Sequence, residues 1–554
     1  MALMAASDFD QLLASDNDAP DEEVEPAEDL DSPQPVGSRL DDWWDSLLNK
    51  TRRAFRWGTP AVVVLIAAFT RLWNLGSPRA LVFDETFYVK DAWTLFNLGY
   101  EGRWPADADT LFNAGQVNSF LAEPSFVVHP PLGKWMIGLG MALVGPENPV
   151  GWRISTAIVG ILAVILLMLI AKKLFKSNLL AVIAGFLFAI DGNAIVMSRV
   201  ALLDNSVMFF TLLGFGAILM DRDWAAVRLS AWLERKDALG KSPSWGPGLW
   251  WRPWLVAAGV ALGAASAVKW NGLYFLAAFA IYTLAVDAVA RRRAGIPFWF
   301  TAAVFKQGPI TFLLMVPVAV ATYFASWTGY FVTDNGYSRT FADQPGAAWT
   351  GPLAWVPHSL QSWWHFEAAV YQYNIHEMRP HSYQANPLTW LFMIRPTSMY
   401  YQASTAGQNG CTSGGYGCGS WITGVANPLI WWAAAAAVFY LTYRLVRYRE
   451  WKVGLILAGV AAGYLPWLLY INRTIFQFYT IAFEPYMILA LVFVIGMILG
   501  KPTDAWHKRT RGIRTVAIYL GVVSLVSAFF FPVWTGQTID YIFMAAHWWL
   551  PTWR

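Results

Sequence analysis

Apolar runs of roughly 20 residues recur along this chain, and they limit its fold more than any other feature, because a helix crossing a hydrocarbon core of about 30 Å needs such a run. Lipid offers no hydrogen-bond partner to the backbone, so the spans must be helices or a closed barrel. The alternation typical of barrel strands is not seen. Only 14% of the 554 residues are charged and 56% are hydrophobic, whereas soluble domains carry about 25% charged residues. The sequence therefore predicts an all-α polytopic membrane protein.

The runs predict about eleven transmembrane helices, near residues 58–75, 153–171, 179–198, 203–220, 254–270, 272–290, 308–328, 427–443, 453–471, 475–499 and 514–532. The apolar stretch 132–145 is shorter, at 14 residues. That length favours an interfacial or re-entrant helix over a span.

Lysine and arginine residues indicate the orientation. With the N-terminus in the cytoplasm, the cytoplasmic segments contain 27 of the 40 Lys and Arg residues, as the positive-inside rule requires. Counting 132–145 as a span would move most basic clusters outside. We therefore expect two large extracytoplasmic loops, 76–152 and 329–426, and an extracytoplasmic C-terminal segment, 533–554.

The N-terminal segment 1–57 precedes the membrane domain, 58–532. Its first 49 residues hold 14 acidic side chains and one basic side chain, Arg39. Such a segment buries too little apolar surface to offset its ordering entropy, so we expect a mostly disordered cytoplasmic tail. It lacks the basic start and apolar run of a cleavable signal peptide.

The chain has two cysteines, Cys411 and Cys418, in one Gly-rich stretch. A disulfide fits an extracytoplasmic loop, and two free thiols are the alternative. Neither a zinc-type Cys/His cluster nor a phosphate-binding glycine loop nor a nucleic-acid-binding patch is present. The sequence therefore predicts no metal cofactor and no nucleic-acid partner.

Ionisable residues gather at the predicted outer face. Charged groups at membrane depth are costly and often mark function, although any single Lys or Arg at a span end could simply extend its charge to the interface. The basic residues of this set lie opposite the cytoplasmic cations that already explain the orientation. The set comprises Asp84, Glu85, His129, Lys134, Arg153, Arg199, Asp204, Lys269 and Arg473.

An anionic lipid head group such as a polyprenyl phosphate would use such cations. Lys134, Arg153 and Arg473 could hold the phosphate and stabilise the charge on the leaving group. A carboxylate nearby could take the proton of an incoming hydroxyl. This combination predicts glycosyl transfer at the outer membrane surface.

The loop 329–426 mixes aromatic and hydrogen-bonding residues, including His376, His381 and Tyr383. It could form the acceptor side of the site, or an interfacial amphipathic helix with Trp anchors. A metal at His376 and His381 would need a regular helix, which Pro380 opposes.

Several segments, taken in their order along the chain, resemble segments of the protein O-mannosyltransferases (glycosyltransferase family 39). They are FDETFY at 83–88, VHPPLGK at 128–134, GWR at 151–153, RVALLDN at 199–205 and VKWNGL at 268–273, followed by the region from Tyr373 to Tyr383 and by Arg395. The similarity spans roughly residues 60–500. The short outer loop without an inserted β-trefoil domain, together with the acidic tail, resembles the actinobacterial branch.

This resemblance implies a GT-C glycosyltransferase fold. It also implies inverting transfer of mannose from polyprenyl-phosphate mannose to Ser or Thr hydroxyls of secreted or membrane proteins, at the outer face of the plasma membrane and without a metal. The secretion translocon could hand over these acceptors. Asp84 matches the catalytic base and Glu85 an adjacent essential acid, while Lys134, Arg153 and Arg473 match contacts to the lipid phosphate. Supporting or substrate-binding positions are His129, Arg199, Asp204, Lys269, His376, His381, Tyr383 and Tyr479.

The sequence departs from the family where His-Tyr often follows the late Arg, since this chain has Gln477-Phe478-Tyr479. Glu484 follows inside a predicted span, where it could pair with Arg473 or another cation. Alternative functions are a GT-C transferase acting on a glycolipid or cell-wall polymer, a lipid or sugar transporter, and a membrane scaffold. The transporter would favour inverted repeats and broken helices at the midplane, and neither is evident in the sequence.

Overall fold

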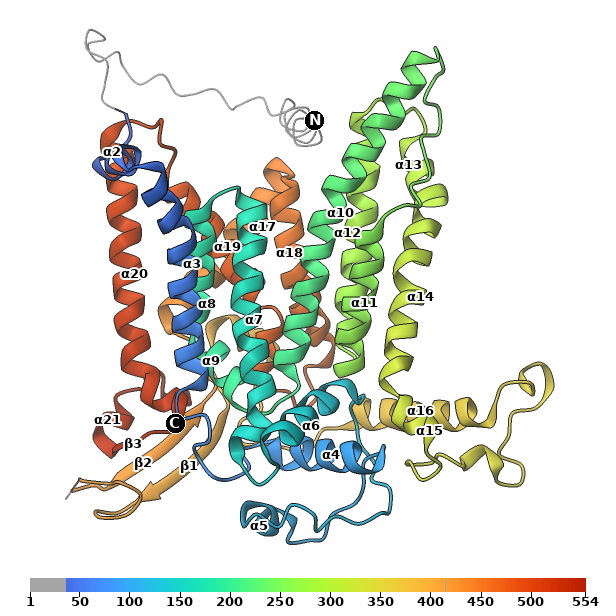
Figure 1. Ribbon diagram of the computed structural model, residues 1–554, viewed down its shortest axis with the longest axis vertical. Coiled ribbons are helices and arrows are strands. Elements are labelled where there is room, and N and C mark those ends of the chain that lie inside the picture. The colour runs from blue at the N-terminus through green and yellow to red at the C-terminus, as the bar shows by residue number, and fades with distance from the viewer. Residues whose placement is uncertain (1–35, 414) are drawn as a thin grey trace.

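A computed structural model describes residues 36–413 and 415–554. Long helices run side by side and form a bundle (Figure 1). They are α3 (Asn49–Leu72), α7 (Pro149–Phe175), α8 (Asn178–Ile190), α9 (Gly192–Arg199), α10 (Asp204–Ala238), α11 (Pro253–Val268), α12 (Gly272–Arg293), α14 (Gly308–Ser326), α17 (Pro428–Tyr448), α18 (Trp451–Tyr464), α19 (Glu484–Leu499) and α20 (Trp506–Thr535).

Seven stretches of the described residues are helical, long and apolar enough to cross a membrane: 49–72, 149–175, 272–293, 299–326, 428–448, 451–470 and 506–535. The pair α8–α9, bent by 61°, adds an eighth if it is one span. Helices α10, α11 and α19 fall outside these criteria. A multi-pass membrane protein is thus confirmed. Each of the eleven predicted spans overlaps a helix, but the number of crossings stays a prediction.

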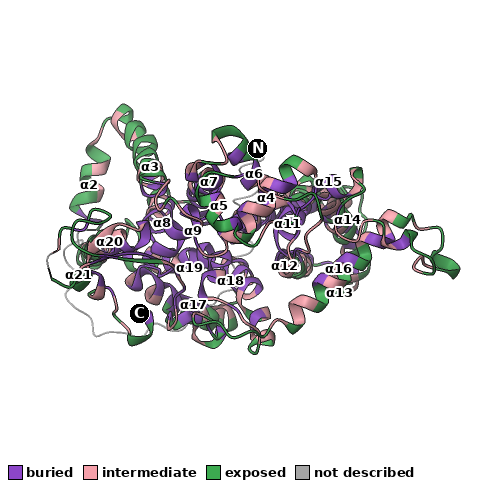
Figure 2. Cartoon of the chain, turned by 90° about the horizontal axis from the view of Figure 1, so that it is seen from below, coloured by how far each residue is buried: buried purple, intermediate pink, exposed green. Residues whose placement is uncertain are grey.

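The predicted span 179–198 is a broken helix. Asp191 ends α8 and caps α9, because its Oδ1 accepts hydrogen bonds from the backbone N–H groups of Asn193 (2.9 Å) and Ala194 (3.4 Å). Its Oδ2 accepts one from the N–H of Asn427, just before α17 (3.0 Å). Viewed from the end that carries α4 and α6, residues of α8, α9 and α19 form much of the buried centre (Figure 2).

The loop 76–152 folds over one end of the bundle. It contains α4 (Glu85–Leu98), α5 (Ala108–Asn113) and α6 (Leu132–Val144). At about 1.5 Å per residue, α6 extends for only about 20 Å. It lies beside α4 at the end of the bundle (Figure 1), which agrees with an interfacial helix at 132–145.

The loop 329–426 lies at the same end of the bundle. It begins within α15 (Thr328–Val332), continues through α16 (His358–His376) and contributes β1 (Ser398–Ser404) and β2 (Cys418–Thr423) to an antiparallel sheet of order β1-β2-β3. The C-terminal segment supplies β3 (Thr538–Asp540) and α21 (Tyr541–Ala545). This sheet is absent from the all-α prediction, and it joins the loop to the chain's C-terminal segment.

Short elements complete the described chain: α2 (Arg39–Ser46), α13 (Trp299–Thr301), the π-helix η1 (Ala302–Gln307), and the 3₁₀ turns η2 (Phe341–Asp343), η3 (Gly351–Leu353), η4 (Pro387–Phe392), η5 (Leu465–Tyr470), η6 (Gln477–Ala482) and η7 (Pro551–Trp553). The predicted disordered tail lies mostly outside the described residues. Within its described part α2 forms, and the helix that contains the first predicted span, α3, begins at Asn49.

Candidate active site

Asp84 occupies the turn that begins α4. The residue before it, Phe83, has a φ of 51°, a left-handed conformation that costs a non-glycine residue on the order of 1–3 kcal/mol. The ring of Phe83 packs edge-on against Phe476, Phe478 and His381, with centroids 5.6, 5.8 and 5.9 Å away. Aromatic residues from two distant segments therefore hold the turn that presents Asp84.

Glu85 has a different environment from its neighbour. It is fully buried, and its Oε1 accepts hydrogen bonds from Arg153 Nε (2.8 Å) and the Ala201 N–H (2.9 Å). Its Oε2 accepts from the Val82 N–H and Arg153 Nη2, both at 2.8 Å. With four donors on its two oxygens, Glu85 joins α4 to α7 and to the segment between α9 and α10.

Arg153 uses its hydrogen-bond donors in the same junction. Besides Glu85, its guanidinium donates to the carbonyl oxygens of Leu75 (3.3 Å), Pro78 (3.0 Å) and Ala80 (2.9 Å). An arginine has five N–H donors, and these contacts account for all of them. The structure therefore favours a positioning role for Arg153 over the phosphate contact predicted from the sequence.

Lys269 lies in the break between α11 and α12. Its Nζ donates to both carboxylate oxygens of Asp204, at 3.0 and 2.9 Å, and lies 4.6 Å from the centre of the Tyr479 ring. Gly272 allows the sharp break, since a Cβ there would lie 2.4 Å from the backbone nitrogen of Ser266. The ion pair thus connects the first residue of α10 to this break.

Asp84, His129 and Tyr88 lie within electrostatic reach of that ion pair. Burial raises the pKa of Asp84 to about 6, an effect that Lys269 opposes and Asp204 reinforces. Burial also lowers the pKa of His129 well below its usual value, and Lys269, Lys134 and Arg473 add to this. The rings of Tyr88 and His129 are 5.9 Å apart. The structure therefore brings the predicted residues Asp84, His129, Asp204 and Lys269 together at one end of the bundle, with Tyr88 beside them.

Arg473 approaches this group from the segment after α18. Its Nη2 donates to Asn374 Oδ1 of α16 (2.8 Å). Its Nε is buried and has no hydrogen-bond partner among residues 36–413 and 415–554. Unlike Arg153, Arg473 thus keeps donor capacity for an anion.

Lys134 lies in the first turn of α6 and is buried against Glu101, with which it forms an ion pair. Asp91 of α4 belongs to the same group: burial raises its pKa to about 7, while Lys134 lowers it and Glu101 raises it. The Lys134 charge is thus compensated within the protein, although it still acts on His129.

Of the remaining predicted site residues, Arg199 serves the fold, His376 lies farther out, and His381 contacts the site through the ring of Phe83. Arg199 donates to carbonyl oxygens at the C-terminal end of α3, among them those of Arg71 (3.1 Å) and Trp73 (2.7 Å). His376 is exposed at the end of α16. His381 is also exposed, and its Nδ1 accepts from the Tyr383 N–H (3.1 Å).

Glu484 does not pair with Arg473. Its Oε2 accepts a hydrogen bond from Asn193 Nδ2 (2.8 Å) in the buried centre. No ion pair within 4.0 Å involves Glu484 in the part of the chain that the structure describes. It therefore belongs to the junction of α9 and α19.

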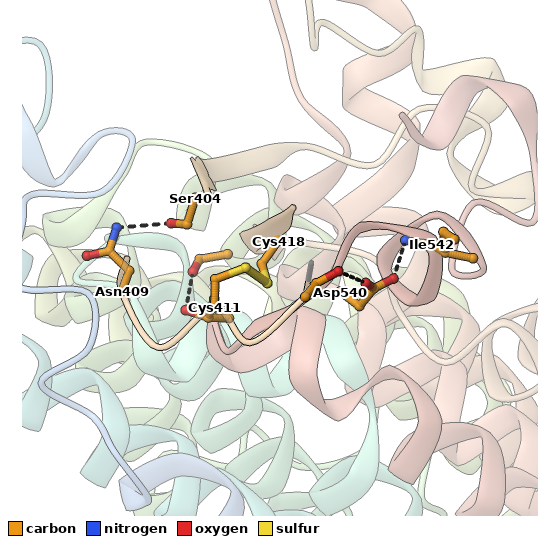
Figure 3. Close-up of a disulfide and its surroundings, with 9 residues drawn as sticks. Ser404, Asn409, Cys411, Cys418, Asp540 and Ile542 are labelled. Atoms are coloured by element: carbon orange, nitrogen blue, oxygen red, sulfur yellow. Dashed lines mark hydrogen bonds between the residues drawn. A yellow bond between two sulfur atoms is a disulfide. The ribbon is translucent and has the colours of Figure 1, made fainter. Parts of the chain in front are cut away.

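Cys411 and Cys418 form a disulfide in the structure (Figure 3). It closes the turn between β1 and β2, where Asn409 Nδ2 also donates to Ser404 Oγ (3.0 Å). Asp540, at the end of β3, accepts a hydrogen bond from the Ile542 N–H (2.8 Å). The disulfide therefore stabilises the sheet β1-β2-β3 and lies outside the group around Asp84.

Sequence reasoning missed Tyr88, Asp91 and Glu101. Tyr88 and Asp91 follow Asp84 by four and seven residues, a spacing that puts side chains on one face of a helix, so a helix predicted from residue 84 would have indicated both. Glu101 lies beyond α4, and its pairing with Lys134 depends on tertiary packing. Among the described residues, no three His, Cys, Asp or Glu side chains gather as metal ligands would.

Comparison with known proteins agrees with the family resemblance seen in the sequence. The family described as dolichyl-phosphate-mannose-protein mannosyltransferase matches residues 146–328. A polyprenol-phosphate-mannose–protein mannosyltransferase of Mycolicibacterium smegmatis (strain MKD8) is 34% identical over 91% of this chain and 94% of its own. The protein of the same name from Mycobacterium tuberculosis (strain CDC 1551 / Oshkosh) is 32% identical over 90% of this chain and 92% of its own.

The fold also matches a solved structure. The chain aligns with one from the Saccharomyces cerevisiae protein O-mannosyltransferase Pmt1–Pmt2 complex bound to the sugar donor, with a TM-score of 0.67, 97% coverage of both chains and 14% identity. The mostly helical GT-C fold expected from the sequence is thereby confirmed, while the number of transmembrane helices stays a prediction.

Proposed function

The chain belongs to the dolichyl-phosphate-mannose-protein mannosyltransferase family, and from this we propose that it transfers mannose from polyprenyl-phosphate mannose to Ser or Thr hydroxyls of proteins. The observation that carries the proposal is the gathering of Asp84, the Lys269–Asp204 ion pair and Arg473 at one end of the bundle. That end is predicted to face outward.

Asp84 acts as the general base. Its raised pKa, about 6, lies near the operating pH at which a base is most effective. As the acceptor hydroxyl oxygen bonds to the anomeric carbon of mannose, its proton moves to Asp84 and the bond from that carbon to the phosphate oxygen breaks. A single displacement of this kind inverts the anomeric carbon and releases polyprenyl phosphate.

Arg473 supplies positive charge to the leaving phosphate, because its Nε has no protein partner among the described residues. Lys269 adds charge nearby, although it is paired with Asp204. Arg153 and Glu85 fix the turn that carries Asp84. Lys134 holds α6 in place through its ion pair with Glu101. This division replaces the three-cation clamp expected from the sequence.

The acceptor enters from the side of α16 and the segment 377–383. Here hydrogen bonding from Tyr373 lowers the pKa of Glu377, and residues 373 and 376–380 line a cavity of about 450 Å³. The protein resides in the plasma membrane with this end outside, so acceptors leaving the secretion translocon could reach it.

The proposal is tested with the full-length protein, purified polyprenyl-phosphate mannose and a Ser/Thr-rich peptide. Asp84→Asn should abolish mannose transfer, because the amide cannot accept the proton, while the thermal unfolding midpoint changes little. Full activity of this variant would remove Asp84 as the base. Equal transfer from another polyprenyl-phosphate sugar, or to a glycolipid in place of the peptide, would contradict the proposed substrates.

A further inference from the structure

Residues 551–553, which form η7, pack against the segment before β1 at the end of the bundle that carries α4 and α6 (Figure 1). Trp553 is 2% exposed, and its Nε1 donates a hydrogen bond to the Met393 carbonyl oxygen (2.8 Å). Its ring lies near one aromatic ring of α17 and one of α20, with centroids 6.5 and 6.3 Å away. The hydroxyl of Thr552 donates to the Ile394 carbonyl oxygen. A buried tryptophan therefore anchors η7 to this segment.

Arg395 extends this contact toward the candidate site. Its Nη1 donates to the carbonyl oxygen of Thr552 (2.6 Å), while its Nε and Nη2 donate to that of Ser382 (3.3 and 2.9 Å). The guanidinium carbon lies 4.8 Å from the centre of the Tyr383 ring. A guanidinium suits this junction, because its planar fork of N–H groups can bond two carbonyl oxygens at once. Arg395 thus joins η7 to the segment that contains Ser382.

The segment 377–385, named the strap below, is tied at both ends to the residues that follow the proposed phosphate-binding arginine. The N–H of Thr474 donates to the Glu377 carbonyl oxygen (3.3 Å), and the N–H of Ala385 donates to the Ile475 carbonyl oxygen (2.8 Å). Between these two ends the strap is mostly exposed. Its middle therefore depends on contacts made with other parts of the chain, and the guanidinium described above supplies two of them.

The middle of the strap also contacts the turn that begins α4. The ring of His381 lies edge-on to Phe83 and Phe476, with centroids 5.9 and 5.0 Å away. Its Nδ1 accepts a hydrogen bond from the N–H of Tyr383 (3.1 Å), so its position depends on the part of the strap that Arg395 holds. The first half of the strap lines the cavity of about 450 Å³ at the end of α16. The strap therefore lies between the proposed base and the proposed acceptor entrance.

We propose that Arg395 and Trp553 are positioning residues for the acceptor, because they hold the strap in the conformation that receives a polypeptide. The inference rests on the proposed function, since the acceptor is a polypeptide only if the protein is a protein mannosyltransferase. Ordering a loop at the moment of binding weakens affinity, whereas a strap that is ordered beforehand avoids this cost. Both residues act through the backbone of the strap and not on the reacting atoms.

The test compares Arg395→Ala with the wild type as purified full-length proteins, using polyprenyl-phosphate mannose and a Ser/Thr-rich peptide. The KM for the peptide should rise roughly fivefold or more, because a hydrogen bond of this kind contributes about that factor. The KM for the donor should stay unchanged. Hydrogen exchange, followed by mass spectrometry, should become faster at residues 377–385 and stay unchanged in α6. Arg395→Lys keeps the charge but lacks the planar fork, so its KM for the peptide should lie between the two.

Two further variants make the result specific. Arg103→Ala removes an exposed arginine from the loop 76–152 and should behave like the wild type. Trp553→Phe keeps a buried ring but loses the hydrogen bond to Met393, and it should also raise the KM for the peptide. This second variant decides the matter if Arg395→Ala fails to fold.

Three results would overturn the proposal: an unchanged KM for the peptide, an equal rise in the KM for the donor, or a lower unfolding midpoint with both KM values unchanged. The last of these is the result expected from a purely structural contact. A wild-type protein that transfers mannose to no peptide would instead refute the proposed function. The exchange at residues 377–385 would then show whether Arg395 and Trp553 hold the strap.

Discussion

Two adjacent carboxylates, Asp84 and Glu85, have opposite environments in this protein. Glu85 is fully buried and accepts four hydrogen bonds, so it has no oxygen left for a reacting proton. Asp84 is only partly buried, and no protein donor holds its carboxylate within the described residues. Sequence alone identified the pair and, through family resemblance, a base and a helper. The four donors to Glu85 come from three separate segments, and only the folded chain reveals them.

The raised pKa of Asp84 predicts a pH dependence. A base must be deprotonated to act, and the pKa of Asp84 is about 6 in the folded protein. Transfer activity should therefore decline as the pH falls through about 6, whereas an ordinary aspartate would keep activity down to about pH 4. The measurement is kcat/KM for the donor against pH, with circular dichroism to verify folding at each pH. An acid limb centred near 4 would contradict the raised pKa.

Arg153 and Arg473 should differ in how their loss affects the enzyme. Arg153→Ala leaves Glu85 buried without its partner, which costs about 3–5 kcal/mol. This variant should have a lower unfolding midpoint and reduced kcat. Arg473→Ala removes donors available to an anion, and a hydrogen bond to a charged group is worth about 1.5–3 kcal/mol. It should unfold like wild type but need at least tenfold more polyprenyl-phosphate mannose for half-maximal rate. If instead Arg153→Ala weakened use of the donor and Arg473→Ala lowered the unfolding midpoint, Arg153 would be the phosphate contact.

At the scale of elements, a short relay of hydrogen bonds connects two helices to the Lys269 break. Trp270 Nε1 donates to the Tyr323 hydroxyl of α14 (3.0 Å), which donates to Glu367 Oε2 of α16 (3.1 Å). Burial raises the pKa of Glu367 to about 7. The relay therefore couples the proposed acceptor-side helix to the residue that follows Lys269.

Tyr323→Phe should weaken this coupling, because it leaves Trp270 Nε1 and Glu367 without their shared partner at a cost of about 1–3 kcal/mol. We expect a lower unfolding midpoint and a several-fold lower kcat, with little change in the KM for the donor. Tyr371→Phe, at an exposed position of α16, is the matched control and should behave like wild type. An unchanged kcat in Tyr323→Phe would show that the relay does not position Lys269.

The disulfide should act locally. The bridged cysteines are seven residues apart, and closing so short a loop stabilises the folded state by about 2–3 kcal/mol in the chain-entropy description. Cys411→Ser/Cys418→Ser should speed proteolytic cleavage and hydrogen exchange between residues 404 and 418. Exchange in α4 and α6, measured by mass spectrometry, should stay unchanged. Equal loosening of those helices would mean that the outer sheet supports the whole site.

Elements were predictable where one physical signal dominated. Apolar runs indicated the helices of the bundle, and the shortness of 132–145 indicated α6. The break at Asp191 escaped detection because the run 179–198 is apolar on both sides of it, and the break depends on hydrogen bonds to Asn193 and to Asn427, which is far along the chain. The strands β1, β2 and β3 escaped for a related reason, since β3 pairs with a strand more than a hundred residues away.

At the scale of the whole molecule, the buried charged groups divide between two ends of the bundle. Asp84, Lys269 and Arg473 lie at one end, while Arg252, in buried ion pairs with Asp221 and Asp287, lies at the other end of α11. Positive-inside counting anticipated this division, because it separates the basic clusters from the other ionisable residues. It could not indicate that Arg252 pairs with two carboxylates or that the fold engages every donor of Arg153, since both depend on packing between distant helices.

The predicted orientation can be tested with single cysteines, because both native cysteines form the disulfide and should not react with a maleimide. Ala106→Cys lies at an exposed position of the loop 76–152, and Ser242→Cys at an exposed position between α10 and α11. A membrane-impermeant maleimide should label Ala106→Cys in sealed spheroplasts, and Ser242→Cys only after permeabilisation. If only Ser242→Cys were labelled in sealed spheroplasts, the protein would have the opposite topology. In that case the proposed mannosyl transfer site would face the cytoplasm, where secreted acceptors could not reach it.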